Sequence, residues 1–363
     1  MLRSLHIIGS RQMGGAESFF LRLVRALNEE DHHALAAVRP SSPLLQELGT
    51  EVEVHLVGLR NSWDIFSSAV IRKLVRETGV EVVQSYMGRA SRLTRLPKGS
   101  RAVHVARLGG FYKIDGYYRH ADAWVGNTKA LCDYLVREGL PAARVFHIGN
   151  FVNPPRQVTP PEVEARRNEL GIPADALVLF SLGRFIDIKG FADLIKAFSE
   201  LPVNIDGRPL HLVLGGDGPL RDRLLNLAAD LDLGDRFHWA GWLRDSAPWF
   251  RLADLFVVPS THETLGNVIL EAWSHHLPVV STTTPGAVEL IEDGVNGLLC
   301  PKGYPGQLAA RCRDLAESAT DRHRLAAAGA VALASNHSRE AVVAAYLDMY
   351  GQLVGSRLQA HHD

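Results

Sequence analysis

Two glutamates eight residues apart, Glu263 and Glu271, stand in a run whose side chains could carry chemistry. The run 261–271 follows an apolar segment, 255–258, that has the pattern of a buried strand, and it ends in a stretch typical of a helix. In an open α/β sheet, a strand–loop–helix junction of this kind lies at the carboxyl end of a strand, where ligands bind. It also presents the free backbone N–H groups of a helix start.

Two other kinds of chemistry fit these residues less well. A carboxylate pair is typical of glycoside hydrolases, but eight residues of continuous helix span about 12 Å at about 1.5 Å per residue, beyond the roughly 5 to 9.5 Å that those enzymes use. A loop that folds Glu263 back would remove this objection. His262-Glu263 begins like a zinc-protease motif, yet Gly266 stands where the second histidine is required, so we expect no metal. Incidental acids on a surface loop and helix are the structural alternative.

A cationic pair, Arg184 and Lys189, lies in the segment 183–190, which follows the strand-like run 177–182. Arginine offers a planar fork to phosphate oxygens and lysine a point charge. We therefore expect the two side chains, with the backbone of Gly183, to hold a diphosphate. Ordinary solvated charges are the alternative.

Two further loops follow strand-like runs. Gly14 and Gly15 precede the first expected helix without the G-x-G-x-x-G spacing of dinucleotide-binding enzymes, which argues against a dehydrogenase. Glycines at a helix start still let the backbone approach a phosphate or sugar closely, although a tight structural turn explains them equally well. Trp242 could contact a base or ribose, while a packed aromatic is the more common role of such a residue.

The elements that must position these residues alternate along the whole chain. Helical stretches separate strand-like apolar runs at 5–8, 35–38, 52–56, 80–84, 103–106, 123–125 and 145–148, and the pattern restarts with 177–182, 210–214, 237–239, 255–258 and 278–281. Such a βα series predicts parallel sheets covered by helices on both faces. Four prolines in 154–161, which cannot join a helix or a central strand, mark a linker. We predict an N-terminal Rossmann-like domain at 1–153, a linker at 154–164, and a C-terminal Rossmann-like domain at 165–338. A last helix, 339–363, is expected to join the first domain.

Length and composition agree with this division. The 363 residues suit two domains, and 46% apolar with 22% charged residues are globular values. Three cysteines without metal-ligand spacing suit a reducing cytoplasm. No export signal and no run of about 18 apolar residues is found, so we expect a cytoplasmic protein without a membrane span.

Charge is divided unevenly although the net charge is −1. Residues 1–153 hold 20 Lys and Arg against 14 Asp and Glu, and the remainder holds 19 against 26. Within the first part, Asp115 alone opposes a run of cations: Arg89, Arg92, Arg95, Lys98, Arg101, Arg107, Lys113 and Arg119. This run predicts a surface for an anionic acceptor or for the anionic inner leaflet of a membrane, with a solvated basic face as the alternative. No nucleic-acid-binding motif is present, so we expect no nucleic-acid partner.

Together these segments resemble the retaining glycosyltransferases of family 4. That family has the GT-B fold, in which two Rossmann-like, doubly wound α/β domains face each other across a cleft. The resemblance covers nearly the whole chain and rests on five segments: Gly14 to Glu17, Gly149 to Asn153, Gly183-Arg184 with Lys189, Gly216 to Pro219, and the pair Glu263 and Glu271.

The resemblance implies roles for these residues. Arg184 and Lys189 would hold the diphosphate of a nucleotide-sugar donor, Glu263 would contact hydroxyls of the donor sugar, and Glu271 would contact the ribose. Backbone N–H groups of Leu265, Gly266 and Asn267 would reach the sugar and phosphate. It further implies a metal-independent reaction without a cofactor, in which front-face attack retains the anomeric configuration. A UDP-sugar is the favoured donor, with GDP- and ADP-sugars as alternatives.

The chain departs from the family at one place. Many relatives carry a histidine just after the strand that matches 103–106, near the reacting sugar, whereas here that position holds Arg107. A shift in register would instead assign His104. With Arg89, these two residues are the expected acceptor contacts.

We therefore expect a glycosyltransferase that moves a hexose-type sugar to a glycan or lipid-linked acceptor, in the synthesis of lipopolysaccharide or another cell-surface polysaccharide. Peripheral contact with an anionic membrane through the N-terminal domain would place it at the inner face of the cell membrane. Two alternatives are a nucleotide-sugar epimerase or hydrolase of the same fold and a non-catalytic nucleotide-sugar-binding protein.

Overall fold

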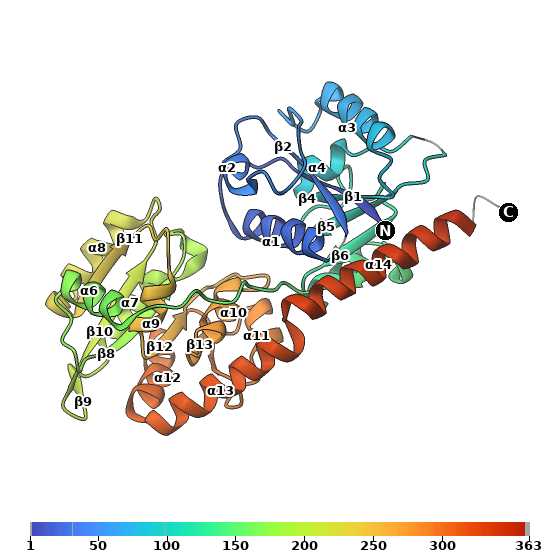
Figure 1. The fold of residues 1–363 in the computed structure, drawn as a ribbon. Coiled ribbons are helices and arrows are strands. Elements are labelled where there is room, and N and C mark those ends of the chain that lie inside the picture. Colours follow the sequence, from blue (N-terminus) through green and yellow to red (C-terminus); the bar gives the residue numbers. More distant parts are fainter. Residues whose placement is uncertain (1, 31, 98, 360–363) are drawn as a thin grey trace. The chain divides into compact units, whose positions relative to one another are not determined.

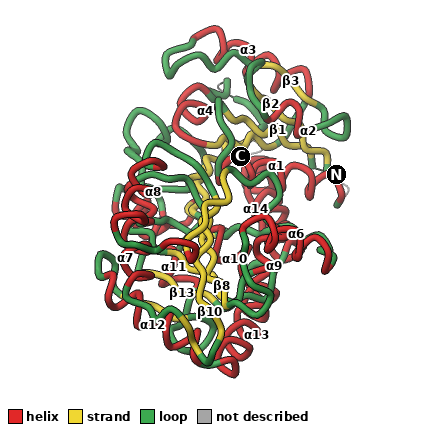
Figure 2. The backbone as a smooth tube through the Cα atoms, turned by 90° about the vertical axis from the view of Figure 1, so that its left-hand side faces the viewer, coloured by secondary structure: helices red, strands yellow, loops and turns green. Residues whose placement is uncertain are grey.

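The computed structural model describes residues 2–30, 32–97 and 99–359, which form two compact units. The first unit contains the described residues of 1–153 and 337–363, and the second contains residues 154–336. In each unit, helices flank a sheet whose main strands are all parallel (Figures 1 and 2). The prediction of two Rossmann-like α/β domains is therefore confirmed.

The sheet of the first unit has the strand order β3-β2-β1-β4-β5-β6-β7, with every neighbouring pair parallel. The strands are β1 (Arg3–Ile8), β2 (His33–Val38), β3 (Val54–Leu56), β4 (Val82–Tyr86), β5 (Val103–Leu108), β6 (Ala123–Gly126) and β7 (Val145–His147). The chain proceeds outward from β1 in one direction and then, from β4, in the other. The loops after β1 and β4 therefore diverge at a topological switch point, which is where open α/β sheets bind ligands.

Alternate residues of these strands pack against helices on opposite faces. Ile8, Ala36 and Val82 belong to the core formed with α1 (Gly15–Glu29) and α14 (Arg339–Gln359). Their neighbours Ile7, Ala37 and Val83 belong to the core formed with α3 (Ile65–Thr78) and α4 (Met87–Leu93). Figure 1 shows these two pairs of helices on the two sides of the sheet. The unit also contains α2 (Leu44–Leu48) and α5 (Lys129–Arg137).

Helix α14 is the last element of the chain, yet its buried side chains complete the core of the first unit. Tyr346 and Tyr350 are fully buried there, and the Tyr350 hydroxyl donates to Gln84 Oε1 at 2.7 Å. At the ends of the helix, Arg339 pairs with Glu29 and Arg357 with Asp122. The C-terminal segment is thus an integral part of the N-terminal unit.

The second unit repeats the architecture with the order β11-β10-β8-β12-β13-β14, and β9 pairs antiparallel to β10. Its strands are β8 (Leu177–Leu182), β9 (Asn204–Ile205), β10 (Arg208–Gly215), β11 (Phe237–Gly241), β12 (Leu255–Val258), β13 (Val279–Thr282) and β14 (Leu298–Cys300). Its helices are α6 (Pro160–Leu170), α7 (Phe191–Ser199), α8 (Arg221–Asp230), α9 (Ala247–Leu252), α10 (Asn267–Ser274), α11 (Pro285–Leu290), α12 (Pro305–Glu317) and α13 (Ala319–Asn336). The order reverses between β8 and β12, so the loops after these two strands form the switch point of this sheet.

The predicted linker is wrong from residue 160 onward. Pro160 and Pro161 are the first residues of α6, where Thr159 and Glu162 form a reciprocal capping box. Proline is tolerated in the first turn because the backbone N–H groups there need no partner inside the helix. These two prolines therefore start a helix rather than prevent one. Of the four prolines in 154–161, only Pro154 and Pro155 lie outside regular structure.

None of the helices in the described part of the chain is both long enough and apolar enough to span a lipid bilayer. Across the same residues, the acidic, histidine and cysteine side chains form no cluster of three or more that could hold a metal ion.

Candidate functional site

Lys189 and Glu263 meet at the carboxyl edge of the second sheet, where they form an ion pair. Lys189 lies in the loop after β8 and Glu263 in the loop after β12, so the pair joins the two loops at the switch point. The side chains are 24% and 19% exposed, which leaves both within reach of a ligand. The structure thus brings together two residues that lie 74 positions apart in sequence.

Backbone contacts fix the same two loops to each other. The N–H of Thr261 donates to the carbonyl oxygen of Ile188 at 2.9 Å. Gly190 has a φ of +68°, and a Cβ added there would lie 1.9 Å from the carbonyl oxygen of Pro259. Only glycine allows both this backbone conformation and this approach. The position of Lys189 is therefore set by a close contact between main chains.

The start of α11, which follows β13, holds the segment that precedes α10. The N–H of Gly286 donates to the carbonyl oxygen of Glu263 at 3.1 Å. A Cβ on Gly286 would lie 2.4 Å from the carbonyl oxygen of Leu265, so the two chains touch. Thr284 accepts from the N–H of Ala287 and caps α11. The backbone of Glu263 is thus held by Gly286, and its carboxylate by Lys189.

Helix α10 begins where the sequence predicts a helix start. Gly266 is its N-cap in the left-handed conformation, with a φ of +86°, and Asn267 is its first residue. Leu265, Gly266 and Asn267 therefore bring their backbone to the positive end of the helix dipole. Glu271 lies in the same helix and is half-buried.

Arg184 carries a charge that the protein leaves unpaired. It is exposed in the loop after β8, and its guanidinium makes no hydrogen bond or ion pair with another described residue. Gly183 beside it donates its N–H to the carbonyl oxygen of Gly215 at 3.1 Å. This bond ties the loop after β8 to β10, so the anchor point of Arg184 is fixed although its charge is open to an anion.

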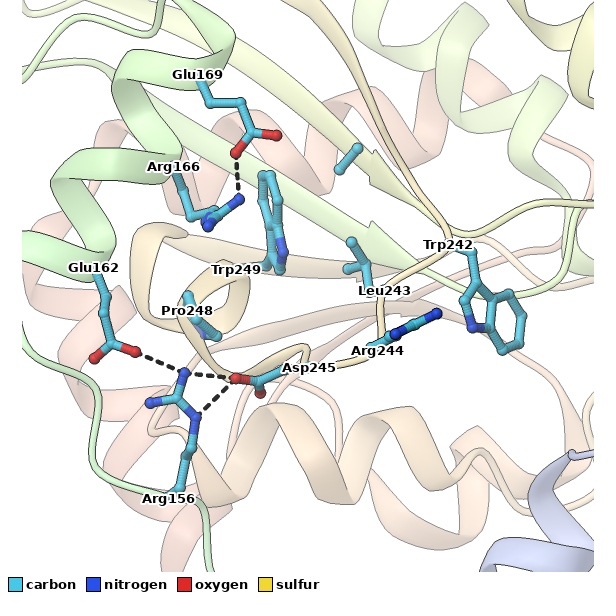
Figure 3. Close-up of a pocket in the computed structure, with 11 residues that line it drawn as sticks. Arg156, Glu162, Arg166, Glu169, Trp242, Leu243, Arg244, Asp245, Pro248 and Trp249 are labelled. Atoms are coloured by element: carbon cyan, nitrogen blue, oxygen red, sulfur yellow. Dashed lines mark hydrogen bonds and ion pairs between the residues drawn. The ribbon is translucent and has the colours of Figure 1, made fainter. Parts of the chain in front are cut away.

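The second unit also contains a cavity of about 370 Å³ between α6, α9 and the loop after β11 (Figure 3). It is lined by Arg156, Glu162, Arg166, Glu169, Ala240, Trp242, Leu243, Arg244, Asp245, Pro248 and Trp249. Most of the charges on its wall are neutralised. Arg156 bridges Glu162 and Asp245, and its hydrogen bond lowers the pKa of Glu162 to about 2.

Trp242 and Arg244 stand at the other side of this cavity, with Arg244 directed toward Trp242 (Figure 3). Trp242 is 64% exposed, so it is not the packed aromatic that its surroundings in sequence suggest. Arg244 forms no ion pair within the residues that the structure describes. Arg244 was not predicted as a site residue, although its place two residues after Trp242 in a loop that follows a strand was a signal for it.

In the first unit, the two expected acceptor contacts on β5 are buried. Arg107 donates from Nε to the hydroxyl of Tyr346 at 3.2 Å and from Nη2 to Asn150, and its guanidinium lies 4.1 Å from the ring centre of Phe19. His104 contacts Ser85 Oγ at 2.8 Å, and burial lowers its pKa well below the ordinary value. In this structure neither side chain can contact an acceptor, because both are buried and form hydrogen bonds inside the unit.

Arg89 belongs to a group of cations at the carboxyl edge of the first sheet. It donates to the carbonyl oxygens of Gly9 and Leu59, at 3.1 and 3.2 Å, and Arg39 donates to the same Leu59 oxygen at 2.8 Å. Burial, with the charges of Arg11 and Arg89, lowers the pKa of Arg39. These three arginines form no ion pair among the described residues. The carboxylate of Asp64 offsets this repulsion only in part, and a bound anion would relieve the remainder.

The glycine loop of the first unit is held by the glutamate of its motif. Gly14 is the N-cap of α1, and both Gly14 and Gly15 are exposed at the helix start. Glu17 is buried and accepts a hydrogen bond from Ser10 Oγ, which fastens the loop to the helix. The role of the two glycines in donor binding stays a prediction.

The run of cations between residues 89 and 119 is not one basic surface. Arg107 is buried, and Arg119 pairs with Asp115 at 2.8 Å. Arg92 stacks on Trp63, with its Cζ atom 3.8 Å from the ring centre. Lys98 lies outside the described residues. Burial of Arg107 and the ion pair of Arg119 therefore leave less free positive charge than spacing in sequence predicts, whereas Arg92 keeps its charge.

Two family models divide the chain between them. "Glycosyltransferase Family 4" matches residues 13–156 and "Glycosyl transferases group 1" matches residues 162–331. The lipopolysaccharide core biosynthesis glycosyltransferase LpsE of Rhizobium meliloti is 35% identical over 338 residues, which cover 93% of this chain and 95% of that protein. A second such enzyme of the same organism, LpsD, is 32% identical over 95% of this chain and 97% of its own.

Solved structures share the fold at lower identity. A glycosyltransferase from Rickettsia africae superposes with a TM-score of 0.87 at 18% identity, over 97% of this chain and 98% of that one. Alr3699/HepE from Anabaena, solved in complex with UDP and glucose, gives 0.81 at 20% identity, over 97% of this chain and all of that one.

Proposed function

Because this chain belongs to the glycosyltransferases of family 4, we propose that it transfers a sugar from a nucleotide-diphosphate-sugar to a lipopolysaccharide core or a related lipid-linked glycan. The family assignment made from sequence is confirmed by both family models. The acceptor class is supported by two relatives that match almost end to end and are named as lipopolysaccharide core enzymes. It is an acceptor made at a membrane, so we assign the enzyme to the cytoplasmic face of the cell membrane.

The observation that carries the proposal is the junction of the loops after β8 and β12, where Lys189 pairs with Glu263 and the loop of Lys189 also carries Arg184, which has no ion-pair partner among the described residues. When the bond between the sugar C1 and the diphosphate breaks, negative charge appears on the departing diphosphate. Preformed cations and a helix N-terminus stabilise such charge without reorganising. Arg184, Lys189 and the start of α10 supply these groups, so the proposed reaction needs no metal ion.

In this proposal Glu263 has two partners. One carboxylate oxygen holds Lys189, and the other is left for a hydroxyl of the donor sugar. Glu271 accepts from the ribose hydroxyls, and the backbone of Leu265 to Asn267 faces the diphosphate and sugar. The exposed ring of Trp242 stacks on the base, with Arg244 as a further cation beside it. A UDP-sugar is the favoured donor, with GDP- and ADP-sugars as alternatives.

The transfer balances without an external acid or base. The acceptor hydroxyl attacks C1 on the face from which the diphosphate leaves, so a new C1–O bond replaces the old one with the same anomeric configuration. The proton of that hydroxyl passes to an oxygen of the leaving phosphate. Negative charge on the diphosphate is largest as the C1–O bond breaks and before this proton arrives, which is when Arg184 and Lys189 act.

The first unit is proposed to bind the acceptor. Arg89 remains a candidate contact, now together with Arg11 and Arg39, because this group of cations forms no ion pair among the described residues and Asp64 offsets its repulsion only in part. Phosphate and carboxylate groups of a lipopolysaccharide core would supply the missing negative charge.

The test combines donor binding with product analysis. Thermal-shift measurements with UDP, GDP and ADP identify the base, since a ligand that binds only the folded state raises its stability. Reaction of the matching nucleotide-sugars with a truncated lipopolysaccharide acceptor should then give a glycosylated product whose anomeric configuration, read by NMR, equals that of the donor. Nucleotide release without a glycosylated product would indicate a hydrolase, an epimerised donor would indicate an epimerase, and an inverted product would overturn the retaining mechanism.

Glu271→Ala tests the ribose contact. Loss of one hydrogen bond to a charged group costs about 1.5 to 3 kcal/mol, so the Kd for the free nucleotide should rise at least about tenfold. Glu292→Ala, a change of an exposed glutamate in the same unit, is the matched control and should leave the Kd unchanged. An unchanged Kd in Glu271→Ala would remove the ribose role.

A further inference from the structure

The three most exposed large apolar side chains among the described residues lie within four positions of one another. Trp63, Ile65 and Phe66 are 76%, 72% and 77% exposed. They stand in the loop before α3 and on its first turn, and the exposed Val70 continues the apolar face one turn further. Helix α3 covers one face of the sheet of the first unit (Figure 1). A concentration of exposed apolar side chains of this kind marks a binding surface.

The segment that carries these side chains is firmly built. Asp64 caps α3 by accepting from the N–H of Ser67 at 3.1 Å, and it also accepts from the N–H of Arg60 at 3.0 Å. The hydroxyl of Ser67 in turn accepts from the N–H of Leu59 at 2.8 Å. The loop is thus closed by hydrogen bonds at both ends. The apolar side chains project from an ordered turn and not from a frayed one.

One cation contacts the exposed apolar side chains, and others lie on α3 and in the segments next to it. The guanidinium of Arg92 lies 3.8 Å from the ring centre of Trp63 while it donates to the carbonyl oxygen of Gly116. The other exposed cations of this region are Arg60, Lys73, Arg76 and Arg95. Its two acids are already engaged, because Asp64 caps the helix and Glu77 pairs with Lys73 at 3.6 Å. The region therefore combines a projecting apolar tip with a net positive rim.

Exposed apolar side chains together with a net positive charge favour an anionic lipid bilayer as the partner. A second copy of the chain would bring the same positive rim against itself, and like charges repel. An anionic bilayer matches both parts: aromatic and aliphatic side chains enter the boundary between headgroups and acyl chains, while Lys and Arg contact the headgroup phosphates.

We propose that Arg60, Trp63, Ile65, Phe66, Lys73 and Arg92, here called the α3 surface, dock the enzyme on an anionic lipid bilayer. Trp63, Ile65 and Phe66 insert, and the three cations remain at the headgroup level. The reason for docking rests on the proposed function, since an enzyme that glycosylates a lipid-linked acceptor has to reach the membrane that holds this acceptor. Docking itself requires neither donor nor acceptor.

The test uses the full chain and sedimentation with vesicles of phosphatidylethanolamine and phosphatidylglycerol. The double variant Ile65→Ser with Phe66→Ser should lower the partition coefficient at least tenfold, with an unchanged circular dichroism spectrum. The variant Arg60→Gln with Lys73→Gln should lower it several-fold and flatten its dependence on salt. Val331→Ser, which removes a 65% exposed apolar side chain of the second unit, is the matched control and should bind as the wild type does.

Equal binding of wild type and double variant would overturn the proposal, and so would equal binding to vesicles of phosphatidylcholine alone. Light scattering that shows a dimer in the wild type and a monomer in the double variant would overturn it in favour of self-association. Activity on a short, water-soluble acceptor, measured without detergent, tests the transferase activity separately from membrane docking. The double variant should retain wild-type turnover on that acceptor, and a wild type that binds vesicles without any turnover would refute the transferase proposal alone.

Discussion

Arg184 and Lys189 follow the same strand, but the protein uses their charges differently. Lys189 is paired with Glu263, whereas Arg184 has no partner among the described residues. A partly exposed ion pair contributes at most about 1 kcal/mol to stability. The pair is therefore better explained as a device that orients a cation and a carboxylate toward one ligand than as a contribution to folding.

Arg184→Ala should lower kcat about 10²-fold and leave the Tm nearly unchanged. Removal of one preformed group that stabilises transition-state charge typically has an effect of this size, and the exposed side chain forms no hydrogen bond or ion pair with another described residue. Lys189→Ala should cause a similar loss of turnover. Initial-rate measurements with thermal denaturation test both variants, and Arg223→Ala, a change of an exposed arginine on α8, is the control. Wild-type turnover in either variant would exclude that residue from the mechanism.

Lys189 and Glu263 could be grouped from sequence because each lies in a loop that follows a strand, and parallel strands bring their carboxyl ends to one edge. Arg107 also ends a strand, yet its burial could not be predicted. Its partners Asn150 and Tyr346 lie 43 and 239 positions away, and the second of them is on a helix that follows the other unit. Local patterns say nothing about which distant side chains will surround a residue.

At the scale of elements, the site depends on how closely the loops after β8, β12 and β13 approach. Gly190 and Gly286 stand at the two points where a side chain would collide with a neighbouring main chain. Packing of main chain on main chain leaves little freedom to Lys189 and Glu263. Catalytic groups need precise placement, and closely packed surrounding residues generally provide it.

Gly190→Ala should destabilise the second unit far more than Gly171→Ala does. The two glycines have nearly the same φ, +68° and +67°, so an added side chain meets the same backbone strain of about 1 to 2 kcal/mol. A Cβ at Gly171 meets nothing within 4 Å, whereas at Gly190 it would lie 1.9 Å from the carbonyl oxygen of Pro259. Chemical denaturation should give about 1 to 2 kcal/mol for Gly171→Ala and at least about 3 for Gly190→Ala, which should also lose activity. Equal values would show that the contact relaxes without cost.

Most strands could be predicted because they are buried on both faces and read as unbroken apolar runs. The short edge strand β14 has only three residues, and its apolar run is too brief to separate from a loop. Pro160 and Pro161 misled the prediction because proline breaks a helix in its interior but fits its first turn. The wrong prediction for these prolines thus concerned a residue type whose effect depends on its position within a helix.

For the whole molecule, buried histidines link stability to pH. Burial is the largest cause that lowers the pKa of His6 to about 3 and those of His32, His238 and His275 to about 4. His6 lies in a chain of hydrogen bonds with Ser4 and Tyr86 inside the first unit. In the folded state such histidines stay neutral at pH values where the unfolded chain binds protons.

The sign follows from linkage. Below pH 6.5 the unfolded state gains protons that the folded state does not bind, so the free energy of unfolding falls as the pH falls toward the folded pKa. A single group contributes about 1.4 kcal/mol per pH unit, which gives about 2 kcal/mol for His6 at pH 5. Denaturation at pH 7.5, 6 and 5 should show this loss, with a shallower slope in His6→Gln and the wild-type slope in His323→Gln, an exposed control. Stability that is flat over this range would contradict the neutral state of these histidines.

The two units differ in whether a continuous piece of chain can form them. Every residue in the core of the second unit comes from 154–336, among them Leu179, Phe198 and Leu212. The core of the first unit includes Tyr346 and Tyr350 from α14, so residues 1–153 lack part of their own interior. Loss of side chains of this size from a core costs about 3 to 5 kcal/mol each, which is comparable with the whole stability of a domain.

Residues 154–336 expressed alone should therefore fold cooperatively and bind the nucleotide that stabilises the full chain, because Arg184, Lys189 and Glu271 all belong to this piece. Residues 1–153 alone should be insoluble or unfolded, and a chain in which 337–363 is joined to them through a flexible linker should recover cooperative unfolding. Denaturation and calorimetric titration of the three proteins provide the measurement, with Glu271→Ala in the isolated second unit as the binding control. A well-folded 1–153 would show that α14 is dispensable. A folded 154–336 without nucleotide affinity would mean that the donor contacts assigned to the loops after β8 and β12 are not sufficient to hold it.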